Sequence, residues 1–162
     1  MRIIGFDADS ENVGVCILDN SACQAGTAVT EFMTLSLPGD TYEARAMRFW
    51  QLMDDLRECY WHEGDMLAVE QINVPRNLDT VRKLAYLVGL LAAAFGRWPI
   101  LVNTAAAYSV VGLSTRMGRT ALKRWVSNHV TAICREHGWS LPVDEHQANA
   151  YCVAEWARIH IR

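Results

Sequence analysis

The order of strand-like and helix-like segments constrains the fold of this chain most strongly. Three runs rich in branched apolar residues, at 2–7, 13–19 and 29–37, are separated by turn-forming residues and predict an antiparallel trio of strands. Strand patterns then recur at 66–72 and 99–103, between helical patterns at 41–60, 77–95, 104–111, 115–136 and 145–161. This order predicts an α/β fold: a five-stranded mixed sheet, with three antiparallel N-terminal strands plus two further strands, flanked by helices.

Length and composition predict one globular domain, residues 1–162, with a substantial core. The chain has 162 residues, of which 51% are hydrophobic and 20% charged, and this excludes a disordered chain. The longest apolar run, residues 84–96, is about 13 residues, whereas a bilayer-spanning helix needs roughly 20. Because Asp7 interrupts the N-terminal apolar run, no signal peptide is expected. We therefore expect a cytoplasmic protein with no membrane partner.

The five cysteines are spread widely and include no C-x-x-C pair, so we expect reduced and mostly buried thiols. Two C-x-x-H spacings, Cys59 with His62 and Cys134 with His137, raise the alternative of a zinc site. Both pairs fall near the ends of predicted helices and lack the glycines of zinc knuckles. The location of these pairs therefore favours ordinary helix residues over a zinc site.

Charge is segregated along the chain. Residues 1–79 carry fourteen acidic and five basic residues, residues 80–135 carry eight basic and no acidic ones, and residues 136–162 carry four acidic and two basic ones. The acid-free stretch predicts a positive surface for a polyanion, beside an acidic region suited to metal binding. The alternative is that its Lys and Arg residues only keep apolar helices soluble.

Two predicted strands each carry a carboxylate near the end of an apolar run. Asp7 follows residues 2–6, and Glu70 lies within residues 66–72. A carboxylate buried there needs a cation or a hydrogen-bonding partner, and the carboxyl ends of neighbouring strands form the usual ligand crevice of an α/β sheet. The pair predicts a metal site. The alternative is an edge-exposed Asp7 and a Glu70 paired with a basic residue.

The last predicted helix has a core-facing stripe that becomes polar at its beginning. His146, Asn149, Val153, Trp156 and His160 recur at spacings of three and four residues. His146 and Asn149 should therefore point inward near the sheet, where they need partners. A satisfied core histidine beside an asparagine is the commoner explanation for such a pair alone.

Four motifs in this order resemble the RuvC-type Holliday junction resolvases of the ribonuclease H-like superfamily. They are Ile4-Gly5-Phe6-Asp7 followed by Ser10 and Gly14, Ala68-Val69-Glu70-Gln71, Val110-Val111-Gly112-Leu113, and His146-Gln147-Ala148-Asn149-Ala150. The resemblance covers nearly the whole chain and implies a ribonuclease H-like sheet.

The resemblance implies that Asp7, Glu70, His146 and Asn149 are catalytic and hold two Mg²⁺ ions per active site, with Mn²⁺ able to substitute. Asn149 departs from the expected Asp, and an amide lacks the charge that Mg²⁺ favours. The protein is therefore interpreted as an inactivated or impaired form, or as one in which Glu145 supplies a further metal ligand. Asp9 also departs, because Gly is common at its position.

The resemblance further implies a structure-selective endodeoxyribonuclease that binds four-way DNA junctions. It would nick two strands symmetrically and leave 5′-phosphate and 3′-hydroxyl ends. A homodimer is expected, because a twofold axis presents two sites to the junction, and the apolar helix at 84–95 is the candidate interface. DNA contacts are expected from seven basic residues: Arg76, Arg82, Lys83, Arg116, Arg119, Lys123 and Arg124.

Two alternatives remain at the level of sequence. One is a protein that binds junctions without cutting them, which Asn149 makes plausible. The other is a phosphotransferase of the actin-like and sugar kinase group, because residues 7–14 also look like a phosphate loop. That loop normally needs Gly where Asp9 stands, and those enzymes need two domains.

Overall fold

The computed structural model of the chain describes residues 1–9, 11–20, 28–71, 78–113 and 119–161. Ser10, Arg76, Asn77 and Arg116 lie outside this part, as does the beginning of the helix predicted from residue 115. The side chain of Arg119 is also outside it.

Five strands form one mixed sheet, as the sequence predicts. They are β1 (Arg2–Ala8), β2 (Asn12–Asp19), β3 (Ala28–Ser36), β4 (Met66–Glu70) and β5 (Ile100–Val102). The spatial order is β3-β2-β1-β4-β5. β1 pairs antiparallel with β2 and β2 antiparallel with β3, whereas β4 runs parallel to both β1 and β5. β1 and β4 therefore end at the same edge of the sheet.

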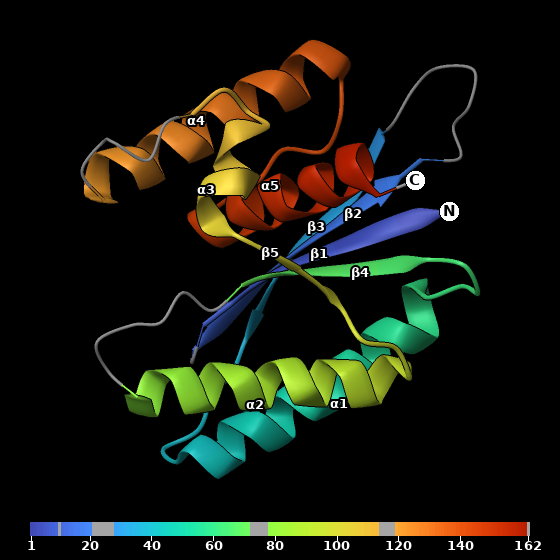
Figure 1. Cartoon of the computed structure of the whole chain (residues 1–162), viewed down its shortest axis with the longest axis vertical. Coiled ribbons are helices and arrows are strands. Elements are labelled where there is room, and N and C mark those ends of the chain that lie inside the picture. The colour runs from blue at the N-terminus through green and yellow to red at the C-terminus, as the bar shows by residue number, and fades with distance from the viewer. Residues whose placement is uncertain (10, 21–27, 72–77, 114–118, 162) are drawn as a thin grey trace.

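Helices cover both faces of the sheet (Figure 1). One face carries α1 (Tyr42–Tyr60) and α2 (Leu78–Phe95). The other carries α3 (Thr104–Ser109), α4 (Arg119–His137) and α5 (Glu145–His160), with α5 lying directly on β1 and β2. In the described part of the chain, none of the helices combines the length and apolar character that crossing a membrane requires.

The predicted boundaries of the helices hold to within a few residues. Thr41 caps α1, because its hydroxyl accepts the backbone N–H of Ala44. The helix predicted at 104–111 ends earlier, at Ser109, and Gly112 follows with a φ of 74°. A positive φ is accessible to glycine and ends a helix at low cost, which explains the early stop.

Alternation along β1 divides the core into two halves. Ile4 and Phe6 pack with Phe49 and Leu87 of α1 and α2, whereas Ile3 packs with the residues of α4 and α5. Because β1 is buried on both faces, its last residues lie between two packed layers.

The described cysteines are free thiols: Cys16, Cys134 and Cys152 are buried and Cys59 is exposed. The expectation of reduced, mostly buried thiols is confirmed for these four. Cys59 lies on α1 and Cys134 on α4, which cover opposite faces of the sheet (Figure 1). The two C-x-x-H pairs therefore cannot share one zinc ion.

Candidate active site

Strand register brings the two predicted carboxylates together. Phe6 of β1 pairs with Val69 of β4 in parallel, so the next residues, Asp7 and Glu70, lie side by side at the same edge. Both project from the face that α5 covers, because Phe6 and Val69 pack on the opposite face. Asp7 is buried and retains 8% of its exposure. The structure thus brings Asp7 and Glu70 together as the sequence predicts.

Two glycines allow α5 to lie against this pair. A Cβ at Gly5 would overlap the carbonyl oxygen of Ala150, and a Cβ at Gly14 would overlap the backbone of His146. Gly14 pairs with Asp7 across β1 and β2, so the close approach at Gly14 sets the first turn of α5 beside Asp7. The absence of side chains at these two positions therefore determines where α5 places its polar residues.

His146 and Asn149 both contact the same oxygen of Asp7. The Nδ1 atom of His146 lies 3.0 Å from Asp7 Oδ2, and the Nδ2 group of Asn149 donates to that oxygen at 3.1 Å. The prediction that these two residues point inward at the sheet is confirmed. As Asn149 is buried, its bond to Asp7 is shielded from water.

A second network fixes the beginning of α5 to β3. Asp144 caps the helix by accepting the backbone N–H of Gln147 at 2.9 Å, and its other oxygen accepts the hydroxyl of Thr34. Gln147 Nε2 donates to the same hydroxyl at 3.0 Å, while its Oε1 accepts the backbone N–H of Val143. His146 and Asn149 are therefore carried on a helix whose first turn is tied to the sheet.

Glu70 is less well compensated than Asp7. Burial and the neighbouring charge of Asp7 raise the pKa of Glu70 to about 7. A hydrogen bond from the Thr104 hydroxyl opposes this shift, as does, more weakly, the charge of Lys123. With a pKa of about 7, Glu70 is partly protonated at neutral pH. A cation between the two carboxylates would relieve the repulsion between their charges.

Tyr108 completes the buried contacts of Asn149. Its hydroxyl donates to Asn149 Oδ1 at 3.1 Å. Burial, followed by the charges of Glu70 and Asp7, raises the pKa of Tyr108, so the hydroxyl keeps its proton. Sequence reasoning missed Tyr108 and Thr104. The signal for both is topological: α3 begins directly after β5, the parallel neighbour of β4, so its residues return to the carboxylate edge.

His146 lies between two acidic side chains. Its Nε2 atom is 3.7 Å from Asp9 Oδ2, on the side opposite Asp7. The hydrogen bond with Asp7 raises the pKa of His146 against the opposing effect of burial. Asp9 Oδ1 also accepts the backbone N–H groups of Glu11 and Asn12, at 2.7 and 2.8 Å. In the segment that also looks like a phosphate loop, these two backbone N–H groups therefore bind the side chain of Asp9.

The four predicted ligands do not form a ready-made cation site. Within the described ranges of the chain, no group of three or more His, Cys, Asp and Glu side chains is arranged to hold a metal ion. His146 and Asn149 present ring and amide nitrogens to Asp7. The crowded carboxyl pair of Asp7 and Glu70 fits a divalent cation, because hard cations prefer carboxylate oxygens.

Glu145, the further predicted ligand, forms an ion pair with Lys123 of α4 at 2.6 Å, whereas His146 and Asn149 contact Asp7. Lys123 is one of the residues predicted to contact DNA, and in this structure it is paired with Glu145.

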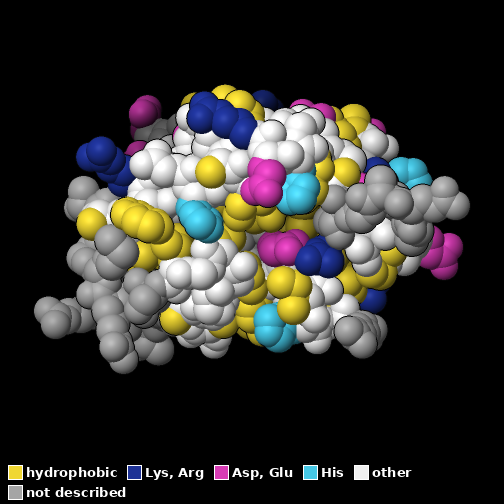
Figure 2. All heavy atoms as spheres, turned by 90° about the horizontal axis from the view of Figure 1, so that it is seen from above, with side chains coloured by type: hydrophobic (Ala, Val, Ile, Leu, Met, Phe, Trp, Pro, Cys, Tyr) yellow, Lys and Arg dark blue, Asp and Glu magenta, His cyan; other side chains and the backbone are white. Residues whose placement is uncertain are grey.

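The other predicted DNA-binding residues differ in exposure. Arg82 and Arg124 are exposed, whereas Lys83 lies 2.7 Å from Asp79 and over the ring of Tyr42. On the face seen in Figure 2, the described Lys and Arg side chains are dispersed, and those near its centre stand beside acidic and histidine side chains. Arg76, Arg116 and the side chain of Arg119 lie outside the described residues.

Solved structures of Holliday junction resolvases share this fold. The structure of Thermus thermophilus RuvC matches with a TM-score of 0.74 at 15% identity, covering 99% of this chain and 95% of that chain. The same protein in complex with a Holliday junction substrate matches with a TM-score of 0.75. The fowlpox virus Holliday junction resolvase matches with a TM-score of 0.51 at 14% identity, over 94% of each chain. At these identities the likeness establishes the fold.

A comparison of sequences found a relative of the same kind as these structures. The crossover junction endodeoxyribonuclease RuvC of Paenarthrobacter aurescens is 28% identical over 150 residues, which are 93% of this chain and 78% of that protein. No family model matches the chain. The predicted resemblance to the RuvC-type Holliday junction resolvases is confirmed as a similarity in sequence and in fold.

Proposed function

We propose that this chain is a structure-selective endodeoxyribonuclease that binds four-way DNA junctions and nicks two strands symmetrically. The observation that carries the proposal is the convergence of Asp7, Glu70, His146 and Asn149 from β1, β4 and α5 on one edge of the sheet. The named activity of the 28% identical relative, and the junction bound by the Thermus protein, support this substrate.

Asp7 and Glu70, with His146 and Asn149, would hold Mg²⁺, or Mn²⁺ in its place, and two ions per site are proposed. When bound, such ions activate a water and stabilise the charge on the leaving 3′ oxygen, giving 5′-phosphate and 3′-hydroxyl ends. The carboxylate of Asp7 is held in place by α5 for this task. His146, whose hydrogen bond with Asp7 raises its pKa, is proposed to assist a proton transfer when its ring does not ligate the ion.

Phosphates are proposed to meet the exposed Arg82 and Arg124, together with Arg76, Arg116 and Arg119 near the same helix beginnings. Lys83 and Lys123 would exchange their ion pairs with Asp79 and Glu145 for phosphate contacts when DNA binds. Such an exchange predicts binding that weakens as salt concentration rises.

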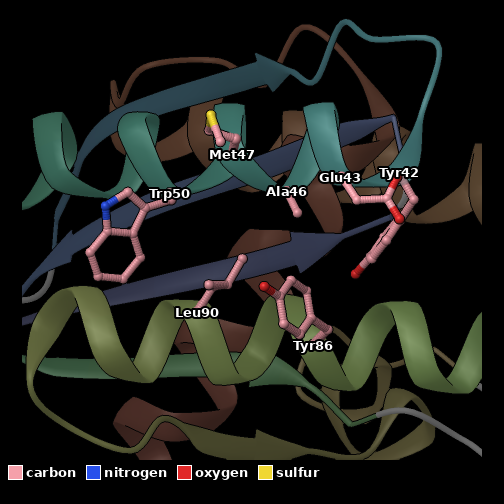
Figure 3. Close-up of a pocket in the computed structure, with 7 residues that line it drawn as sticks. All are labelled: Tyr42, Glu43, Ala46, Met47, Trp50, Tyr86 and Leu90. Atoms are coloured by element: carbon pink, nitrogen blue, oxygen red, sulfur yellow. The ribbon is translucent and has the colours of Figure 1, made fainter.

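A homodimer is proposed to form through the outer face of α1 and α2. A groove of about 560 Å³ between them is lined by Tyr42, Glu43, Ala46, Met47, Trp50, Tyr86 and Leu90 (Figure 3). Met47 is 67% exposed and Tyr86 54% exposed, so an apolar surface is available for a second copy. The predicted interface, residues 84–95, contributes Tyr86 and Leu90 to it, while Leu87 and Leu91 pack in the core.

Cleavage of a labelled four-way junction tests the proposal. The chain and its Asn149→Asp variant are incubated with the junction in Mg²⁺ and in Mn²⁺, with Glu70→Gln as the matched control that keeps size and removes charge. We expect symmetric nicks from Asn149→Asp, slower nicks from the unmodified chain, and binding without nicks from Glu70→Gln. Absence of nicks from both the chain and Asn149→Asp would contradict the nuclease proposal.

A second candidate function is junction binding without cleavage. It is favoured by the orientation of Asn149, which directs its nitrogen toward Asp7. Retained junction binding with no nicks in either metal, for the chain and for Asn149→Asp alike, would support it.

A further inference from the structure

Asn149 uses both ends of its amide in buried hydrogen bonds. Its Nδ2 group donates to Asp7 Oδ2 at 3.1 Å, and its Oδ1 atom accepts the hydroxyl of Tyr108 at 3.1 Å. Asn149 is 9% exposed and Tyr108 is 7% exposed. The three residues form one chain of hydrogen bonds from α3 through α5 to β1.

This arrangement decides which atom the amide can offer to a cation. An amide binds Mg²⁺ or Mn²⁺ through its oxygen, because the nitrogen carries only donor hydrogens. Here the oxygen faces Tyr108. Turning the amide over would set its oxygen against the carboxylate of Asp7, so that two acceptors would face each other. It would also break two buried hydrogen bonds, and buried polar groups left without a partner are costly.

The α5 side of Asp7 is therefore occupied by hydrogen-bond donors. The ring of His146 approaches the same oxygen, Oδ2, at 3.0 Å, and neither it nor Asn149 contacts Oδ1 in these bonds. The β4 side has the opposite character, because Glu70 and Asp7 are both acceptors when charged. On the β4 side, two carboxyl groups therefore face each other, with the hydroxyl of Thr104 donating to Glu70.

We propose that Tyr108 is a positioning residue that locks Asn149 with its nitrogen toward Asp7. Of the two cation positions proposed for the active site, this chain consequently fills only the one on the Glu70 side of Asp7. This inference rests on the proposed nuclease function, because it concerns the same carboxylates. Its consequence is that the second cation position is closed by the Tyr108–Asn149 pair and opens when that pair is removed.

Mn²⁺ binding to the full chain tests this directly. The number of bound ions is measured from the electron paramagnetic resonance signal of free Mn²⁺, for the chain, Asn149→Asp and Tyr108→Phe. We expect one ion for the chain and two for Asn149→Asp. Tyr108→Phe should bind a second ion more weakly, because the amide oxygen of Asn149 is then free to turn toward it. Tyr151→Phe is the matched control: Tyr151 is also buried, but it interacts with Glu155, and one ion is expected.

Glu70→Gln separates the two ways of failing. If Glu70→Gln binds Mn²⁺ as the unmodified chain does, the proposed metal site itself is wrong. If Glu70→Gln removes the ion but the chain binds two ions of similar affinity, or Tyr108→Phe equals the chain, the role of Tyr108 is overturned while the site stands.

A second measurement covers variants that fail to fold. In the ¹⁵N-labelled chain, the side-chain amide protons of Asn149 should exchange slowly with solvent and persist in Mg²⁺, and Tyr108→Phe should speed their exchange roughly tenfold. Rapid exchange in the unmodified chain would overturn the lock without any need for Asn149→Asp.

Discussion

On the α5 side of Asp7, His146 and Asn149 approach one carboxylate oxygen with ring and amide nitrogens, whereas on the β4 side the neighbour is a second carboxyl group. The first side is compensated by hydrogen bonds that the fold itself supplies. On the second side, the hydroxyl of Thr104 donates to Glu70 and the charge of Lys123 acts more weakly. The raised pKa of Glu70 leaves that carboxyl group partly protonated at neutral pH. This difference is the basis of our proposal that a cation binds on the β4 side.

The largest expected effect comes from separating α5 from the sheet. Gly14→Ala places a Cβ against the backbone of His146, so the helix must move or the chain must unfold. We expect the free energy of unfolding to fall by about 3 kcal/mol or more, measured by urea denaturation. Gly89→Ala is the matched control, because nothing lies within 4 Å of a Cβ there. It should be neutral or slightly stabilising, and equal losses from both variants would contradict the close-approach argument.

The β4 side should give a pH dependence of stability that Glu70→Gln removes. Because the pKa of Glu70 rises to about 7 in the folded protein, above its ordinary value, the folded state holds the proton more tightly. This contribution to stability is complete below the ordinary value and is lost as pH rises through 7. In chelator, we expect the free energy of unfolding to decrease by on the order of 2 kcal/mol more between pH 5 and 8 than it does for Glu70→Gln. Parallel curves for the two proteins would argue against the raised pKa.

Thr104→Val removes the hydroxyl that donates to Glu70 while keeping the shape of the side chain. We expect a loss of about 1–2 kcal/mol at pH 8, where Glu70 is charged, and a smaller loss at pH 5. Chemical denaturation at both values measures it. Thr104→Ser keeps the donor and should stay close to the unmodified chain; if it behaves like valine, the hydroxyl is not what matters.

The smallest expected effect concerns Asp9, on the outer side of His146. Asp9→Asn keeps an oxygen for the N–H groups of Glu11 and Asn12 but removes a charge near Nε2 of His146. The pKa of His146 should fall slightly, because the larger contribution of Asp7 remains. Proton NMR titration of the imidazole measures it, and an unchanged pKa would mean that Asp9 serves the turn alone.

Much of the fold was predictable because it depends on periodicity. The apolar run ending at Asp7 and the stripe that includes His146 and Asn149 indicated a strand and a helix whose polar ends face the core. The predicted order of strands and helices along the chain is confirmed. Tyr108 and Thr104 could not be found in this way, since nothing in the short helix α3 distinguishes them from core and cap residues. Their importance arises only from the parallel pairing of β4 with β5.

The amino-acid sequence by itself determined which elements form and which side chains are candidates for the chemistry, because local periodicity and residue type are properties of the chain. The tertiary structure decided how those side chains are oriented. Gly5 and Gly14 allow α5 to approach the sheet so closely that His146 and Asn149 contact Asp7, and Tyr108 directs the Asn149 amide. Orientation of this kind depends on the packing and hydrogen bonds of residues far apart in the chain, so only the assembled fold sets it.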